Sequence, residues 1–191
     1  MEKVIKGLQI LWQRLTQQGL STTLWWALDH AVRILTGANI RRVSQITPNL
    51  YVGGQHRRHG LARMRRQGIT AVVNMRDEFD DEAAGLGFPH YLYLPTIDDQ
   101  APTFERLDLG VEFIAEQIAR GGVVYVHCGS GIGRAATMAA AYLISTGMTR
   151  DQALDRIRQS RPFIRPTPPQ MERLEEYAAR QVSGHKQQQE E

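Results

Sequence analysis

One stretch, residues 123–138, constrains the fold of this 191-residue chain more than any other. It opens with VVYV, residues 123–126, whose β-branched and aromatic side chains are typical of a short buried strand. Three glycines follow at alternate positions: Gly129, Gly131 and Gly133. An alanine-rich segment, residues 135–141, then predicts a helix. Because backbone N–H groups can point into such a loop and the helix start adds positive charge, the stretch predicts an anion site.

The loop also holds the only cysteine of the chain, Cys128, close to the predicted helix start and to Arg134. Both features favour the nucleophilic thiolate. The planar fork of Arg134 can hold two phosphate oxygens at once. A nucleophile in a phosphate cradle predicts phosphoryl transfer to sulfur. The predicted phosphate-binding residues are Gly129, Ser130, Gly131, Ile132, Gly133 and Arg134, with Cys128 and Arg134 catalytic.

His127 and Cys128, then five residues and Arg134, resemble the signature loop of the cysteine-dependent protein tyrosine phosphatases, in particular the dual-specificity branch. The resemblance implies an α/β fold: one domain with a central mixed, mostly parallel sheet flanked by helices. An N-terminal helical extension is expected in addition, from the pattern of apolar residues described below. The resemblance extends over residues 44–180 and is strongest with the mitochondrial lipid-phosphatase-like subgroup and its bacterial relatives. Two alternatives stay open, a buried cysteine beside a chance glycine turn and a rhodanese-type sulfur carrier, whose loop is usually one residue shorter.

A second segment, LPTIDDQAPT at residues 94–103, offers a proton donor for the leaving oxygen. Asp98 and Asp99 both qualify. The resemblance favours Asp98 as the general acid, because the family places an aspartate after a strand and a proline at the start of a mobile loop. We assign Asp99 a supporting role, with helix capping as the alternative for either residue.

Four further positions are candidates for supporting roles. We expect His127 to orient the loop backbone rather than act as a base. The resemblance implies that Gln170 positions the hydrolytic water, and an exposed first-turn glutamine is the alternative. Arg161 and Arg165 are expected on the surface, or at the rim of the cleft. No metal and no cofactor is expected, since the six histidines are scattered.

The sequence departs from the family directly after Arg134, where a serine or threonine usually assists release of the thiolate. Here the residue is Ala135. Either Ser130 or Thr137 replaces that hydroxyl, or breakdown of the phosphoenzyme is slow. A non-catalytic or weakly active phosphate-binding module is therefore the alternative function, and a scaffold acting through its N-terminal helices is a second rival.

The chain order predicts three parts: an amphipathic helical extension at 1–40, a catalytic domain at 41–182 and a disordered polar tail at 183–191. The extension carries two apolar stripes at helical spacing, which we expect to pack on the domain or on a partner. Their residues are Ile5, Leu8, Trp12 and Leu15, then Leu24, Leu28, Ala31 or Val32, and Leu35. Ser21 or Thr22 is the expected cap of the second helix.

Hydrophobic period and turn residues predict the other elements. They are a strand–turn–strand unit over 45–54, strands over 69–75 and 91–94, and helices over 57–67, 103–120, 135–146, 150–160 and 170–181. Thr103 and Thr149 are expected helix caps. The acidic run at residues 77–82 is most simply a solvated loop, although it is similar to the acidic loop of the lipid phosphatases.

Charge and cysteine content limit the partners. The net charge is only +3, but residues 41–66 hold seven arginines and no acidic residue. A solvated face is the first interpretation, and attraction to anionic substrates or a membrane surface the second. A lone cysteine suits a reducing cytoplasm. The expected substrates are phosphorylated proteins or a phospholipid monoester, with an inositol head group disfavoured because the loop lacks lysine. No nucleic acid partner is expected, peripheral membrane contact through residues 1–37 is the minority hypothesis, and the oligomeric state is left open.

Overall fold

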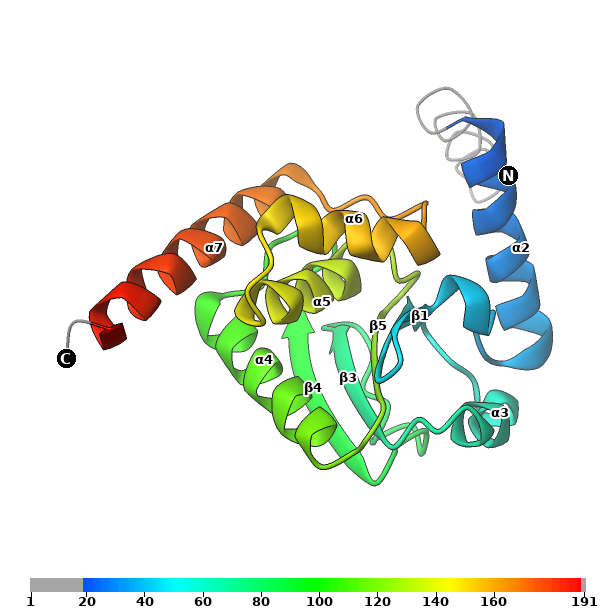
Figure 1. The fold of residues 1–191 in the computed structure, drawn as a ribbon. Coiled ribbons are helices and arrows are strands. Elements are labelled where there is room, and N and C mark those ends of the chain that lie inside the picture. Colours follow the sequence, from blue (N-terminus) through cyan, green and yellow to red (C-terminus); the bar gives the residue numbers. More distant parts are fainter. Residues whose placement is uncertain (1–18, 190–191) are drawn as a thin grey trace.

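The computed structural model describes residues 19–189, with side chains as far as residue 183. The first predicted apolar stripe therefore lies outside the described residues. Figure 1 shows the arrangement of the elements. The helices are α2 (Leu20–Thr36), α3 (Leu61–Arg66), α4 (Phe104–Ala119), α5 (Arg134–Ser145), α6 (Arg150–Ser160) and α7 (Pro168–Gln189), with short 3₁₀ turns η1 (Arg41–Val43) and η2 (Arg58–Gly60). The strands are β1 (Gln45–Thr47), β2 (Leu50–Gly54), β3 (Ala71–Arg76), β4 (His90–Thr96) and β5 (Val124–Cys128).

The five strands of the described residues form one sheet in the order β1-β2-β5-β3-β4. β1 pairs antiparallel with β2, and all other pairs are parallel. This confirms the predicted α/β fold with a mixed, mostly parallel sheet. β5 is the middle strand, and its end at Cys128 is level with Gly54 of β2. Because ligands of open parallel sheets bind at the carboxyl ends of the strands, this register places Cys128 where a site is expected.

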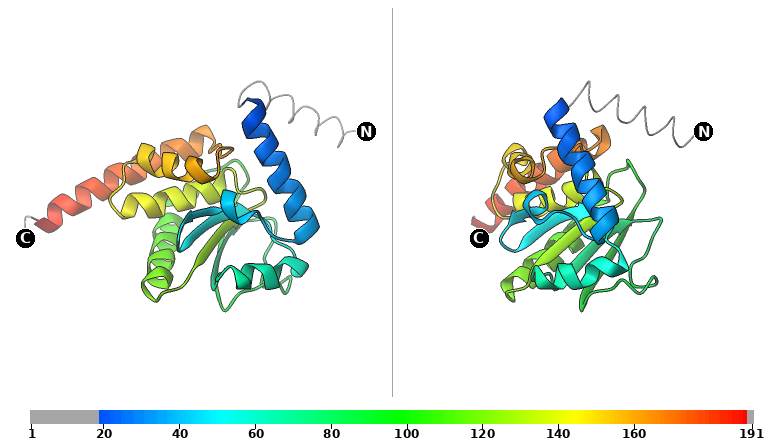
Figure 2. Two further views of the ribbon diagram at one scale, coloured as in Figure 1. Left: turned by 45° about the vertical axis from the view of Figure 1, so that its right-hand side comes forward. Right: turned by 90° about the vertical axis from the view of Figure 1, so that its right-hand side faces the viewer.

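The sheet is covered on both faces, as alternating side chains along the strands require. On one face Val124 and Val126 join a large core with α4, α5, α6 and α7. On the other face Tyr125 packs with Met64 of α3 in a smaller cluster. The central helix, α5, is buried on nearly all sides, which its alanines permit because small side chains allow close approach. Figure 2 shows α2 and α7 at opposite ends of the molecule.

Helix α2 differs from its prediction in two respects. Its cap is Gly19, and no side-chain hydrogen bond caps it, so the prediction of Ser21 or Thr22 is wrong. The second apolar stripe faces outward, because Leu24, Leu28 and Leu35 are exposed. The buried residues of α2 are polar or charged: Thr23, Asp29 and Arg33. The helix is therefore held to the domain by polar contacts and by the half-buried Trp25 and Trp26, not by its leucines.

The remaining elements agree with the sequence to within a few residues, with two exceptions. The expected helix at 57–67 is split into η2 and α3. Helix α7 continues to Gln189, past the expected end at residue 181, so most of the expected disordered tail is helical, as its glutamines allow. Thr103 and Thr149 cap α4 and α6 as predicted. Among the described helices, none combines the length and the apolar character that crossing a membrane requires.

Candidate active site

The predicted phosphate loop connects the end of β5 to the start of α5, so Cys128 ends the strand and Arg134 begins the helix. The backbone N–H of Gly131 donates to Sγ of Cys128 at 3.3 Å. Gly131 has φ of +69°, and an added Cβ would lie 2.3 Å from the backbone of Gly53. Only glycine fits there, because the loop turns left-handed and touches β2.

Arg134 is the charged group beside the sulfur, and it is only 2% exposed. Burial acts to lower its pKa. Its hydrogen bonds with Glu78 and the negative charges of Cys128 and Asp98 outweigh burial and raise the pKa. The guanidinium therefore stays charged, within electrostatic range of Cys128.

The donors of Arg134 divide into two groups. Nη1 faces the protein: it donates to the carbonyl of Thr96 at 2.7 Å and to Oε2 of Glu78 at 2.9 Å. Nη2 contacts Oε1 of Glu78 at 3.1 Å and Oδ1 of Asp98 at 2.9 Å. Nε is buried and makes no hydrogen bond. A buried donor without an acceptor is costly, so the Nε–Nη2 edge is the side on which a phosphate oxygen would be held.

Glu78 comes from the acidic run after β3, which the sequence predicts to be solvated. Glu78 is exposed, as predicted, but it is also bound to Arg134, and the prediction is wrong for Asp81. Glu78 holds Arg134 through both carboxylate oxygens, and this interaction lowers the pKa of Glu78 well below its usual range. Asp81 is completely buried. The sequence held one indication that these residues belong to the site, because the acidic run directly follows β3 and β3 pairs with the strand that ends at Cys128.

Asp98 and Asp99 follow β4 and are both exposed. Asp98 reaches the site: its carboxylate is 76% exposed, yet one oxygen contacts Arg134. Asp99 adopts a left-handed backbone with φ of +62°, and its carbonyl accepts a hydrogen bond from Oγ1 of Thr167. The structure thus brings Asp98 to Arg134, while Asp99 shapes the loop that carries it.

Behind the loop lies Arg161, which is completely buried. The expectation of a surface or rim position is wrong for this residue, whereas Arg165 is exposed. Nε of Arg161 donates to the carbonyl of Gly131 at 2.7 Å, and Nη2 donates to the carbonyl of Ser130 at 2.9 Å. One side chain therefore holds two loop carbonyls from the side opposite the sulfur.

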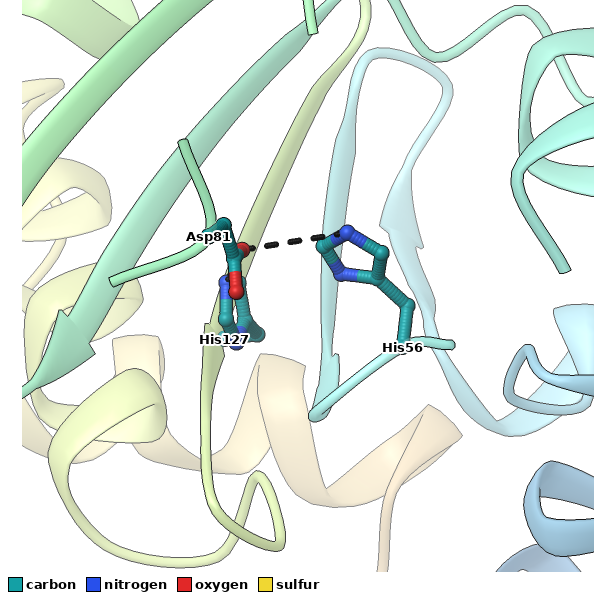
Figure 3. A group of neighbouring side chains, drawn as sticks. All are labelled: His56, Asp81 and His127. Carbon is teal, nitrogen blue, oxygen red and sulfur yellow. Dashed lines mark hydrogen bonds and ion pairs between the residues drawn. The ribbon is translucent and has the colours of Figure 1, made fainter. Parts of the chain in front are cut away.

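His127, Asp81 and His56 form a buried group beside the loop, and the carboxylate of Asp81 faces both rings (Figure 3). Nε2 of His127 lies 2.7 Å from Oδ2 of Asp81, and its Nδ1 lies 3.4 Å from the carbonyl oxygen of Cys128. His127 thus touches the loop backbone as expected. Nε2 of His56 lies 3.7 Å from the same carboxylate and 3.1 Å from the carbonyl of Leu86.

These three residues are also of the types that bind metals. Two ligands of one tetrahedral ion with bonds near 2 Å are about 3.3 Å apart. The 2.7 Å separation of His127 and Asp81 is instead that of a hydrogen bond. Burial and the nearby His127 lower the pKa of His56 to about 4, so its ring is neutral at pH 7. The group fits a hydrogen-bond network that orients His127 better than it fits a metal centre.

Gln170 is completely buried, so the alternative of an exposed glutamine is wrong. Its Nε2 donates to the carbonyl of Gln100, in the segment that carries the acid candidates, at 3.0 Å. A Cβ on Gly133 would lie 2.8 Å from its Oε1. Gln170 therefore joins the last loop residue to the Asp98 segment.

The hydroxyl groups near Ala135 can also be placed. Ala135 is completely buried. The hydroxyl of Thr137 donates to the carbonyl of Gly133 at 3.1 Å, one helical turn back. Ser130 is half-buried, and its carbonyl is bound by Arg161. Thr137 is thus engaged with the helix backbone, which weakens its case as a replacement for the family hydroxyl.

Comparison with known proteins gives consistent matches. The model of the dual specificity phosphatase catalytic domain matches residues 50–180. Dual specificity protein phosphatase 2 of Mus musculus is 36% identical over 124 residues, which are 64% of this chain but 38% of that protein. Phosphatidylglycerophosphate phosphatase PTPMT2 of Arabidopsis thaliana is 29% identical over 157 residues, 79% of this chain and 69% of that protein. The chain thus spans well under half of the mouse protein.

Solved structures show the same similarity. The crystal structure of PTPMT1 in complex with PI(5)P has a TM-score of 0.67 and 28% identity, covering 73% of this chain and 96% of that chain. The crystal structure of DUSP15 has a TM-score of 0.64 and 26% identity, covering 77% and 94%. The fold around the loop is therefore shared with both protein and lipid phosphatase relatives.

Proposed function

Because the chain belongs to the dual-specificity phosphatase family, we propose that it hydrolyses phosphate monoesters through a phosphocysteine intermediate. The observation that carries the proposal is that residues from three segments meet at the guanidinium of Arg134. Cys128 ends β5, Arg134 begins α5, and Asp98 follows β4, with its carboxylate 2.9 Å from Arg134. Nucleophile, phosphate-binding cation and acid therefore meet at one place.

The reaction has two steps. The thiolate of Cys128 attacks phosphorus, the phosphorus–oxygen ester bond breaks, and Asp98 gives its proton to the leaving oxygen. Water then attacks the phosphocysteine while Asp98 takes a proton, and the sulfur leaves as thiolate. In both steps Arg134 and the loop amides stabilise the charge on the equatorial oxygens. The protein supplies each of these groups itself, so the scheme needs no cofactor.

The proposed substrates are phosphorylated proteins or a phospholipid monoester, because both activities occur in the names of its relatives. The wider alignment with the Arabidopsis lipid phosphatase, 79% of this chain, favours the lipid. PTPMT1 has been crystallised with PI(5)P, so an inositol lipid belongs in the tests although the loop lacks lysine.

A substrate panel with wild type and Cys128→Ser tests the proposal. The panel contains p-nitrophenyl phosphate, phosphotyrosine and phosphothreonine peptides, phosphatidylglycerophosphate and PI(5)P. We expect wild type to hydrolyse the aryl phosphate and at least one natural class, and Cys128→Ser to lose activity by about 10⁴-fold or more. Phosphate binding without turnover in wild type would instead identify a non-catalytic module.

We also propose that the protein works in the cytoplasm and that the outer face of α2 contacts an anionic membrane. Its exposed aliphatic residues form one uncharged stripe: Leu20, Leu24, Leu28, Ile34 and Leu35. Exposed Arg41 and Arg42 follow the helix in η1 and carry the complementary charge. Buried apolar area and attraction to anionic lipid together drive interfacial binding.

Vesicle co-sedimentation tests this contact. The double variant Leu24→Glu/Leu28→Glu should lose binding to phosphatidylcholine vesicles that contain phosphatidylglycerol. Leu109→Glu on α4 is the matched control, since Leu109 is 47% exposed and Leu28 is 49% exposed. Equal binding by wild type and the double variant would contradict the membrane contact.

A further inference from the structure

Asp29 lies on the inner face of α2, outside the segment that matches the family, and is 2% exposed. A buried carboxylate is stable only when its oxygens are paired. Oδ1 accepts the backbone N–H of Ile40 at 3.0 Å. Oδ2 accepts Nδ2 of Asn39 at 2.6 Å and Nη2 of Arg161 at 3.2 Å. Asp29 therefore joins α2 to the arginine behind the phosphate loop.

Arg161 is 132 positions away from Asp29 in the sequence and is completely buried. Besides the two loop carbonyls, its Nη1 donates to the carbonyl of Val43 at 3.2 Å. Among the residues that the structure describes, Asp29 is the carboxylate within ion-pair distance of Arg161. Without this carboxylate the buried guanidinium would lose its charge partner, and its orientation would rest on neutral carbonyls and on the ring of Phe163, whose centroid is 4.4 Å from Cζ.

The two loop carbonyls determine where two loop amides point. In a trans peptide the C=O and the following N–H point in opposite directions. The carbonyl of Ser130 belongs to the same peptide group as the N–H of Gly131, which donates to the sulfur. The carbonyl of Gly131 is likewise paired with the N–H of Ile132. By holding both carbonyls outward, Arg161 directs both N–H groups into the cradle.

We propose that Asp29 is a positioning residue for the reaction at Cys128, acting through Arg161 on the amides of Gly131 and Ile132. The inference rests on the proposed phosphatase function. According to this proposal, α2 helps to support the phosphate loop although it precedes the residues that match the family. Asp29 does not touch the phosphate; it keeps Arg161 charged and oriented.

Asp29→Asn tests the proposal, because asparagine has the same size and keeps an acceptor for Ile40 but removes the charge. Thr23→Val is the matched control: Thr23 is buried on the same face of α2, and its hydroxyl donates to Gly19 one turn back. We expect kcat/KM for p-nitrophenyl phosphate to fall about tenfold in Asp29→Asn, mainly through kcat, and less than twofold in Thr23→Val.

The second measurement is the pH profile of alkylation of Cys128 by iodoacetamide. The chain has one cysteine, so the mass change reports that site alone. A less firmly held Gly131 amide stabilises the thiolate less, and the profile should move to higher pH in Asp29→Asn but not in Thr23→Val. A merely structural role of Asp29 would lower the melting temperature without moving this profile.

Arg161→Gln and the double variant complete the test. If Asp29 acts through Arg161, the Asp29 change should cost little once Arg161 is replaced. Additive losses, or an unchanged alkylation profile in Asp29→Asn, would overturn the proposal. If Asp29→Asn does not fold, Arg161→Lys replaces it, since lysine keeps a charge for Asp29 but its three donors cannot serve all four acceptors that Arg161 binds. An unchanged alkylation profile in Arg161→Lys would also overturn the proposal. Wild type that fails to hydrolyse aryl phosphate contradicts the phosphatase function alone, because alkylation needs no turnover.

Discussion

Two buried arginines flank the phosphate loop, and their partners differ in kind. Arg134, in front, contacts Glu78 and Asp98, whose carboxylates are 42% and 76% exposed. Arg161, behind, contacts three backbone carbonyls and the buried Asp29. Besides the buried carbonyl of Thr96, the front arginine thus has two solvent-exposed carboxylate partners, whereas the charged partner of the rear arginine is buried.

The difference follows from what each arginine must do in the proposed reaction. A phosphate oxygen must replace a partner of Arg134 during every turnover, so at least one partner has to be easily displaced. Asp98 is such a partner, because an exposed ion pair contributes little stability. Arg161 must keep the loop amides still, and buried, fully paired polar groups rearrange only at high cost. The exposure of the carboxylate partners therefore distinguishes Arg134, which is proposed to bind the substrate, from Arg161, which supports the loop.

Exchanging each arginine for lysine gives the largest expected effect. Arg134→Lys should lose about a thousandfold in kcat, because a single ammonium cannot hold two phosphate oxygens in the transition state. Arg161→Lys should lose less activity, about tenfold, but more stability, since at least one buried carbonyl loses its donor. Aryl phosphate kinetics and thermal melting of both variants measure this, and a reversed ranking of the two activities would contradict the division of roles.

The exposed partner of Arg134 gives the next effect. Asp98→Asn should lower kcat about a hundredfold through loss of the proton donor, while phosphate inhibition stays as strong or becomes stronger. The neighbouring Asp99→Asn is the control, and its kcat should change little. Kinetics with p-nitrophenyl phosphate and inorganic phosphate separate the two, and full activity in Asp98→Asn would remove it as the acid.

The sequence predicts the front of the site better than the back. The spacing of Cys128 and Arg134 within one local loop, and the strand before Asp98, are visible as short patterns. Arg161 and Asp81 act through buried contacts with residues 30 or more positions away, and no local pattern reports such contacts. For α2 the helical period is correct, but the leucine stripe does not pack on the domain, which was one of the two expected alternatives. Asp29 and Arg33 have partners that let them be buried in place of the leucines.

His56 belongs to the buried group with Asp81 and His127, and its lowered pKa predicts that stability depends on pH. Its pKa is about 4 when folded, against an ordinary value of 6.5. Between these values the unfolded state binds the extra proton, so stability falls as pH decreases from 6.5 toward 4, by at most about 3 kcal/mol. The lowered pKa of Asp81 acts in the same direction at still lower pH.

Melting temperatures measured from pH 7 to pH 5 check this dependence. We expect a steeper decrease for wild type than for His56→Gln, which retains a donor for the carbonyl of Leu86 but does not titrate. His59→Gln, at an exposed position near by, should follow wild type. Parallel curves for wild type and His56→Gln would show that the buried histidine does not control the acid limit.

The smallest expected effect concerns Ala135, which directly follows the front arginine. With the Thr137 hydroxyl bound to Gly133, the thiolate that leaves the phosphoenzyme lacks an assigned hydroxyl to stabilise it by a hydrogen bond. We therefore expect a burst of p-nitrophenol followed by a slow steady rate. Ala135→Ser should raise the steady rate about fivefold and reduce the burst, with a ceiling set by the close packing of this fully buried position. Thr137→Val should leave both phases unchanged. Equal steady rates in wild type and Ala135→Ser would mean that dephosphorylation is not the slow step, and that the front of the loop is complete without this hydroxyl.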